Sequence, residues 1–491
     1  KPAIIRIYVG TGQTQETIEN VSVELMAWSS DAPGVPLPGS PLLVGPGAVP
    51  HEDLLQQRLN PNTLSVLLPD AWQLPYSPGR KLVLMATVKA APSQPELNTA
   101  NNTRIETAYF LPGRTQSIMV AQISYAGCPT VSFQDPRFAA SLAYMEDLYP
   151  VSHVDWYLFP SGKPILTSTP LNIPGVVPGG CGQGWSNLLN LMIWQFYGVT
   201  GMPYNWSLYG LIDDCVPGGG GCGQAIPNVA AGYLGGVDTM AHEVGHNMNL
   251  VHAPCGDVGD YDAGFPHYAN PGGGEYPWAS IGEVGVRLRG GLTLFDPART
   301  YDIMSYCGGD PTPWISPYNY WNLSSFEIWQ ASADRTAADL RQVIAVGQVL
   351  GPGALQLQPL WVRTMPDQTT GAGSGPYHVE VQDAGGGELA SGDFAPDHHE
   401  SASPDAGAFA AVLPYPQNAA RVVFSYQGQV LQTISASPHA PTVTITYPVG
   451  GEVWAASGTY TVTWQQSDAD GDALLSNVLY SPDHGATWAP A

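Results

Sequence analysis

The sequence is short of charged residues, and above all of lysine. Only 12% of its 491 residues are charged, with 17 basic residues, four of them lysine, against 41 acidic ones. The formal net charge is -24. Nucleic-acid binding needs clustered lysine and arginine side chains that displace counterions, so we expect no nucleic-acid partner.

The sequence also lacks long apolar runs. The nearest candidate, residues 188–199, is interrupted by Asn190 and Gln195 and falls short of the roughly 18 residues of a membrane span. We therefore expect no transmembrane segment. The chain begins at Lys1 with no charged-then-apolar leader after it, which is typical of a mature or trimmed form.

Cysteine is scarce and confined to one part of the chain. The six cysteines lie between residues 128 and 307, and none form a CxxC pair. This distribution favours a local disulfide framework in a secreted protein over a thiol site. Cys215 and Cys222 flank VPGGGG and could close a small loop, while Cys255 and Cys307 bracket a longer segment. Six cysteines allow about 15 pairings, so the connectivity stays open.

Glycine and proline, by contrast, are abundant. The 56 glycines and 46 prolines favour many short strands joined by ordered turns. The length predicts about three or four domains. Short runs of alternating polarity predict a β-sandwich over residues 1–112 and another over 336–438. Residues 439–491 open an immunoglobulin-like β domain, which at about half the usual length we expect to be incomplete.

Residues 113–335 differ from the segments on either side. SIMVAQISY predicts a buried strand, and a helix follows in which Asp135 is the N-cap and Pro136 the first helical residue. HVDWYLF predicts another strand, and SNLLNLMIWQFYG a second helix with Ser186 as its cap. Strands that alternate with helices indicate an α/β domain.

The segment HEVGHNMNLVH, residues 242–252, holds three of the eleven histidines of the chain. In a helix, His242 and His246 lie four residues apart on one face, where their rings can share a zinc ion. Glu243 lies at the edge of that face, where its carboxylate can take a proton from a metal-bound water that attacks a carbonyl. This pattern predicts metal-assisted peptide hydrolysis.

The alternatives explain these residues less well. Two histidines can be incidental on a helix, but a third at a defined offset makes chance a poor explanation. A structural zinc site fills all four positions with protein ligands, whereas three histidines leave one open.

The third histidine requires the helix to end. His252 lies six residues after His246 and cannot share its helix face, so the chain must reverse between them. Such a turn needs a left-handed backbone, which glycine adopts freely and asparagine tolerates next best. We therefore expect Asn249 to end the helix with a positive φ, so that His252 reaches the metal.

These residues resemble the signature of the metzincin clan of zinc endopeptidases, HExxHxxGxxH followed by a methionine turn. Asn249 stands in place of the glycine, and YDIMSYC is similar to the turn. The resemblance covers about residues 113–330 and is specific across 242–252 and 301–307. It implies that Met304 packs beneath the histidines without ligating the metal.

The same resemblance suggests roles for neighbouring residues. In some metzincin families a tyrosine at the position of Tyr306 ligates zinc or stabilises the oxyanion; otherwise it is a packed aromatic residue. A disulfide between Cys255 and Cys307 would tie the third-ligand loop to the methionine turn. Residues 224–233 would supply the edge strand that pairs with an extended substrate.

A different class of zinc protease takes its third ligand from a glutamate on a later helix. The candidates here are Glu275 and Glu283, but neither lies in a convincing helical pattern and neither explains His252.

The resemblance implies a multidomain protein in which an α/β (α+β) metzincin-like catalytic domain is flanked by all-β sandwich domains. It implies a secreted or cell-surface zinc endopeptidase acting on extracellular proteins or glycoproteins. The β domains carry no recognisable chemistry, and binding to a cell surface or to glycans is their plausible role. The rival hypothesis is an adhesion or structural protein with a degenerate protease domain, against which the intact histidines and Glu243 argue.

A structural calcium ion is the second cofactor to consider. DADGD at residues 468–472 alternates acids, but its glycine stands at the fourth position and the twelfth is a leucine, so it fails the EF-hand pattern. A solvated turn is the simpler interpretation, with a cadherin-like calcium contact as the other. Asp257, Asp260 and Asp262 are further candidate ligands, although a polar loop explains them better.

Overall fold

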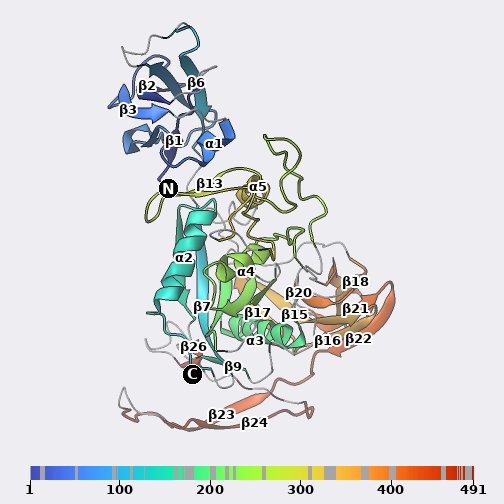
Figure 1. The fold of residues 1–491 in the computed structure, drawn as a ribbon. Coiled ribbons are helices and arrows are strands. Elements are labelled where there is room, and N and C mark those ends of the chain that lie inside the picture. The colour runs from blue at the N-terminus through green and yellow to red at the C-terminus, as the bar shows by residue number, and fades with distance from the viewer. Residues whose placement is uncertain are drawn as a thin grey trace. The chain divides into compact units, whose positions relative to one another are not determined.

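The computed structural model describes most of the chain. The described residues are 2–10, 17–49, 54–90, 96, 98–110, 114–125, 128–159, 164–167, 171, 182–199, 206–215, 220–224, 228–256, 261–307, 312–325, 339–366, 375–396, 405–454, 460–472, 474, 476, 479–480 and 489–490. They form many strands in several separate sheets and a few helices, as a multidomain, β-rich protein is expected to (Figure 1).

The chain divides into two compact units, each built from several segments. The first unit comprises Lys1–Ile118, Phe133–Asp155 and Gly235–Trp329, and the second Met119–Ser132, Trp156–Leu234 and Gln330–Ala491. Among the described helices, none is long and apolar enough to cross a membrane. The boundaries of the four domains expected from the sequence stay predictions.

The first unit begins with a four-stranded antiparallel sheet in the order β3-β2-β5-β6. Alternate residues of β2, from Val21 to Ala27, are buried while those between them are more exposed, as expected for a strand with one face on a core. The elements of this region are β1 (Ile4–Arg6), β2 (Ile18–Ser29), β3 (Leu42–Val49), α1 (Leu54–Leu59), β4 (Ser65–Leu67), a 3-10 helix (Asp70–Trp72), β5 (Leu82–Lys89) and β6 (Thr103–Ala108).

The rest of the first unit carries the helices that matter for the histidine motif. These elements are α2 (Pro136–Leu148), α4 (Thr239–Asn247), the hairpin β13 (Gly285–Arg287) with β14 (Thr293–Phe295), and α5 (Pro317–Ser325). The predicted cap of α2 is confirmed: the side chain of Asp135 accepts a hydrogen bond from the main-chain N–H of Arg137, and Pro136 is the first helical residue.

A six-stranded sheet has most of its residues in the second unit. Its order is β11-β12-β10-β7-β8, and β9 also pairs with β7. The elements are β7 (Thr115–Tyr125), β8 (His153–Leu158), β9 (Ile165–Thr167), α3 (Gln183–Val199), β10 (Trp206–Ile212), β11 (Gly221–Gln224) and β12 (Val229–Tyr233).

Two sequence expectations about these elements are wrong. Because α3 begins at Gln183, Ser186 lies inside the helix and does not cap it. The expected edge strand, residues 224–233, contains β12, which lies between β11 and β10. Among the described strands, β11 lies at that end of the sheet, where it runs antiparallel to β12.

Residues 339–435 form two further sheets. Along β15 and β20, odd-numbered residues face one core and even-numbered residues another: Val343 and Ala345 pack with Phe409, and Ile344 and Val346 with α3. The strands are β15 (Asp339–Gly351), β16 (Ala354–Leu357), β17 (Trp361–Pro366) and β20 (Gly407–Pro414) in one sheet, and β18 (Tyr377–Asp383), β19 (Glu388–Phe394), β21 (Ala419–Tyr426) and β22 (Gln429–Ser435) in the other.

The last described strands are paired in twos. They are β23 (Thr442–Tyr447) with β24 (Thr463–Ser467), and β25 (Leu479–Tyr480) with β26 (Ala489–Pro490). Every residue of β23 and β24 is exposed.

Two disulfides are defined by the described residues. Cys255 and Cys307 are bonded, as the sequence resemblance implied. Cys215 is bonded to Cys128, so the expected small loop between Cys215 and Cys222 is wrong. The reason is non-local: Cys128 follows β7 and Cys215 follows β10, and these strands are neighbours in the sheet.

Candidate metal centre

The helix α4 carries the first two histidines through the core of the first unit. Apolar residues on several of its sides are buried, including Met240, Ala241 and Val244. A side chain at Gly245 would be crowded, because its Cβ would stand 2.7 Å from Met304 Sδ and 3.3 Å from Tyr149 Oη. Gly245 therefore lets the helix approach Met304 closely.

The helix ends as Asn249 was expected to make it end. Asn249 has a φ of 62°, in the left-handed region. Its N–H donates to the carbonyl of His246 at 2.9 Å, and the N–H of Leu250 donates to that of Gly245 at 3.0 Å. This pair of bonds is a Schellman motif, in which a left-handed residue turns the chain back across the last helical turn.

The rings of His242 and His246 are each held by a main-chain carbonyl. Nδ1 of His242 lies 2.8 Å from the carbonyl oxygen of Ile303, and Nδ1 of His246 lies 2.8 Å from that of Leu250. Because a carbonyl oxygen only accepts hydrogen bonds, each Nδ1 carries the proton. In the neutral ring each Nε2 then presents a lone pair, which is the state that a histidine ligand of a metal requires.

The two Nε2 atoms lie close to each other. The Nε2 atoms of His242 and His246 are 3.2 Å apart. Two ligands at about 2.0–2.1 Å from a tetrahedral zinc ion would be roughly 3.3 Å apart. Two lone pairs this close repel each other unless a cation or a shared proton lies between them, so the pair fits a metal ion.

His252 completes the group. Its side chain is fully buried, and its ring centroid lies 4.7 Å from that of His246 and 5.3 Å from that of His242. Ring nitrogens of the three histidines lie within 4.8 Å of one another, so this group could hold a metal ion. The carbonyl of His252 accepts a hydrogen bond from the N–H of Asp262 at 2.9 Å, which helps to fix its loop.

The predicted catalytic acid–base residue lies beside the ligands. Glu243 is on α4 next to His242 and is only 4% exposed. Nearby, the hydroxyl of Tyr149 donates to the carbonyl of Ala241, and burial raises its pKa well above the ordinary value. Tyr149 therefore stays neutral and secures the start of the helix.

Residues 302–307 touch each segment that carries a histidine. The carbonyl of Ile303 holds His242, and Met304 Sδ packs against Gly245, between the first two histidines. The carbonyl of Met304 accepts from the N–H of Ala253, next to His252, at 2.9 Å. Met304 is fully buried, in agreement with the packing role that its motif implied.

Tyr306 lies at the rim of the group. Its ring centroid is 4.7 Å from that of His252 and 5.7 Å from that of His242, and 38% of the residue is exposed. Beneath it, Gly256 has a φ of 88°, and a Cβ there would stand 2.7 Å from Tyr306 Cβ. The N–H of Tyr306 donates to the carbonyl of Cys255 at 3.0 Å, beside the Cys255–Cys307 disulfide.

Sequence reasoning missed Asp302, which anchors this segment. Its carboxylate is fully buried and accepts hydrogen bonds from the N–H of Met304, the N–H of Ser316 and the side-chain amide of Asn319. Burial raises the pKa of this carboxyl group, and the hydrogen bonds oppose the rise. Apart from its place two residues before Met304, nothing in the sequence marks it.

The other candidate ligands lie elsewhere. Glu283 forms an ion pair with Arg58, and Glu275 Oε2 lies 3.4 Å from His267 Nδ1. Neither glutamate belongs to the histidine group. Asp262 accepts a hydrogen bond from the hydroxyl of Tyr318 at 2.7 Å, which raises the pKa of the tyrosine. Asp257 and Asp260 lie outside the described residues.

The DADGD segment does gather its acids. Carboxylate oxygens of Asp468, Asp470 and Asp472 lie within 4.8 Å of one another. Asp470, however, already accepts hydrogen bonds from Ser437 and His439, which lower the pKa of its carboxyl group. The expected structural calcium ion stays a prediction.

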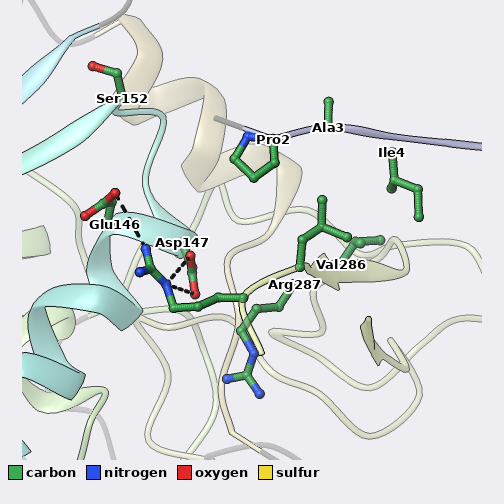
Figure 2. Close-up of a pocket in the computed structure, with 10 residues that line it drawn as sticks. Pro2, Ala3, Ile4, Glu146, Asp147, Ser152, Val286 and Arg287 are labelled. Carbon is green, nitrogen blue, oxygen red and sulfur yellow. Dashed lines mark hydrogen bonds and ion pairs between the residues drawn. The ribbon is translucent and has the colours of Figure 1, made fainter. Parts of the chain in front are cut away.

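A pocket of about 470 Å³ lies apart from the histidines, and none of the candidate site residues lines it (Figure 2). Arg289, one of its lining residues, pairs with two acids of α2: its Nε lies 3.0 Å from Asp147 Oδ1 and its Nη2 3.5 Å from Glu146 Oε1. Its lining residues are Pro2, Ala3, Ile4, Glu146, Asp147, Ser152, Val286, Arg287, Leu288 and Arg289.

Comparison of the chain with known protein families and with curated proteins found no match.

Proposed function

We propose that this protein is a secreted or cell-surface zinc endopeptidase with a metzincin-like catalytic domain. The observation that carries the proposal is the convergence of three histidines, two of which have Nδ1 bound to carbonyls and Nε2 atoms 3.2 Å apart. The three-histidine set leaves one position of a tetrahedral ion for water or substrate, which is typical of catalytic zinc sites.

His242, His246 and His252 would hold the ion. A zinc ion bound there would lower the pKa of its water toward about 7 and polarise a carbonyl group. Glu243, beside His242, accepts the proton of the attacking water and passes it to the leaving amine. The hydroxyl of Tyr306, at the rim, donates a hydrogen bond to the developing oxyanion.

The substrate class follows from the location that the disulfides favour. We propose that the substrate is an extracellular protein or glycoprotein. The two disulfides of the described residues fit an extracellular location, since such bonds persist in oxidising compartments.

Casein hydrolysis by the wild type and by Glu243→Gln, measured together with their zinc contents, tests the proposal. We expect about one zinc per chain in both proteins and cleavage by the wild type alone, because the amide cannot accept the proton. A chelator should abolish wild-type cleavage. Absence of stoichiometric metal, or equal cleavage by Glu243→Gln, would contradict the proposal.

The same experiment addresses the rival hypothesis of an adhesion or structural protein with a degenerate protease domain. A wild type that holds zinc but cleaves no peptide bond in casein or in a proteome-derived peptide library would favour that hypothesis. The exposed strands and immunoglobulin-like segments would then carry the main function.

A further inference from the structure

Asp302 is a buried charged group that the proposed chemistry does not use. No part of it is exposed, and its carboxylate accepts hydrogen bonds of 2.8–2.9 Å from the N–H groups of Met304 and Ser316 and from the side-chain amide of Asn319. The side chain of Ser316 contributes a further hydrogen bond. A buried carboxylate is costly unless several donors satisfy it, and these donors do so. Such an arrangement needs an explanation beyond filling space.

One of these bonds leads directly to the metal centre. The N–H of Met304 and the carbonyl of Ile303 belong to the same planar peptide group. On one side this N–H donates to Asp302 Oδ1 at 2.9 Å, and on the other the carbonyl accepts from His242 Nδ1 at 2.8 Å. The carboxylate and the imidazole therefore lie at the two ends of a single peptide unit.

A charge on the carboxylate at one end of this series of hydrogen bonds affects the imidazole at the other end. An anionic acceptor polarises the peptide group, which makes its carbonyl oxygen a stronger acceptor. A stronger acceptor holds the ring of His242 with its proton on Nδ1 and makes Nε2 a better ligand. In many metal sites a carboxylate bonds to the histidine itself; here a peptide group stands between the two.

We propose that Asp302 is a positioning residue that acts through the Ile303–Met304 peptide to orient His242 and strengthen it as a metal ligand. The inference rests on the proposed function, since it presumes that the three histidines bind zinc. Asp302 touches neither the metal position nor the substrate.

The test compares zinc dissociation constants of the wild type, Asp302→Asn and Asn319→Ala, each purified as the full chain. Asp302→Asn keeps the shape of the side chain but removes its charge, and we expect zinc to bind roughly tenfold or more weakly. Asn319→Ala is the matched control, because it removes a donor to the same oxygen, Oδ1, and leaves the bond to Met304. We expect its zinc affinity to stay within about twofold of wild type.

A cobalt spectrum and the Nδ1 proton of His242 add readouts that simple destabilisation would not change. In cobalt-loaded protein, Asp302→Asn should shift the visible absorption bands, and Asn319→Ala should not. In zinc-loaded wild type labelled with ¹⁵N-histidine, the Nδ1 proton of His242 should exchange slowly with water. This last measurement needs no variant, so rapid exchange of the proton would overturn the inference even if Asp302→Asn did not fold.

Equal zinc affinities for the wild type and Asp302→Asn would overturn the inference. Equal losses of zinc affinity in Asp302→Asn and Asn319→Ala would also overturn the inference. They would show that Asp302 acts by holding α5 in place. Rapid exchange of the His242 proton in the wild type would be a third contradiction. If the wild type bound no zinc, the proposed function itself would fall, and the inference with it.

Discussion

At the scale of single residues, the candidate site depends on a few backbone and ring positions. Asn249 takes the left-handed conformation that the reversal toward His252 requires. The Nδ1 atoms of His242 and His246 are fixed by carbonyls, which leaves Nε2 for a metal. The position of Asn249 could be predicted because a turn of known length needs a positive φ. Asp302 could not, since its other partners follow 14 and 17 residues later without a motif.

Replacing Asn249 tests the backbone argument. Asn249→Gly should keep the zinc content and the free energy of unfolding close to wild type, because glycine adopts a positive φ without strain. Asn249→Val should lower the free energy of unfolding by about 1–3 kcal/mol and weaken zinc binding, because a β-branched residue is strained there. Urea unfolding and zinc titration measure both effects. A valine variant that matched wild type would show that the turn does not depend on this conformation.

Replacing Tyr306 with phenylalanine tests the hydroxyl at the rim. The variant should retain zinc, since the ring still packs on His252, and its kcat should fall by about 100-fold if the hydroxyl stabilises the oxyanion. Steady-state kinetics on one peptide, with zinc content measured in parallel, gives the answer. An unchanged kcat would reduce Tyr306 to a packing role, and a loss of zinc would make it a ligand.

At the scale of elements, the candidate site lies where α4 packs against the segment 302–307. Short sequence patterns predicted the N-cap of α2 and the end of α4 at Asn249. Long-range features were not predictable. Cys215 pairs with Cys128 because β7 and β10 are neighbours in the sheet, and among the described strands β11 lies at the end of the sheet because β12 pairs on both sides. Neither feature can be predicted from short stretches of sequence.

The packing of α4 on Met304 predicts coupling between this residue and Gly245. Alone, Gly245→Ala should destabilise the fold despite the better helix propensity of alanine, because the new Cβ meets Met304 Sδ. Alone, Met304→Ala should cost about 2–5 kcal/mol through the cavity it leaves. The double variant should lose less free energy of unfolding than the two single variants added together, by roughly 0.5–3 kcal/mol, because the alanine at position 245 fills part of the cavity. Strict additivity in urea unfolding would mean that the two residues do not touch.

At the scale of the whole molecule, the dominant property is a net charge of -24 on a β-rich chain. Such a charge produces a negative potential that attracts cations and repels anions. The scarcity of lysine and arginine predicts that the protein has no nucleic-acid partner, and this stays a prediction. Composition does not predict which peptide sequence would be cleaved, because that preference depends on the side chains that line the site.

If the protein is the proposed endopeptidase, its charge predicts which peptides it binds and cleaves faster. At low ionic strength kcat/KM should be higher for a lysine-rich peptide than for a glutamate-rich peptide with the same scissile residues. Raising the salt should narrow the difference, because mobile ions screen the field beyond about 10 Å at 0.1 M. A preference that does not change with salt would come from direct contacts instead.

The central claim is a zinc ion held by three histidines with one position open, and X-ray absorption at the zinc edge of the purified protein tests it most directly. We predict three imidazole nitrogens at about 2.0–2.1 Å and one further oxygen ligand, with the imidazole signal lost in His252→Ala. A protein without zinc would contradict the account, and so would an ion with four protein ligands, as in a structural site.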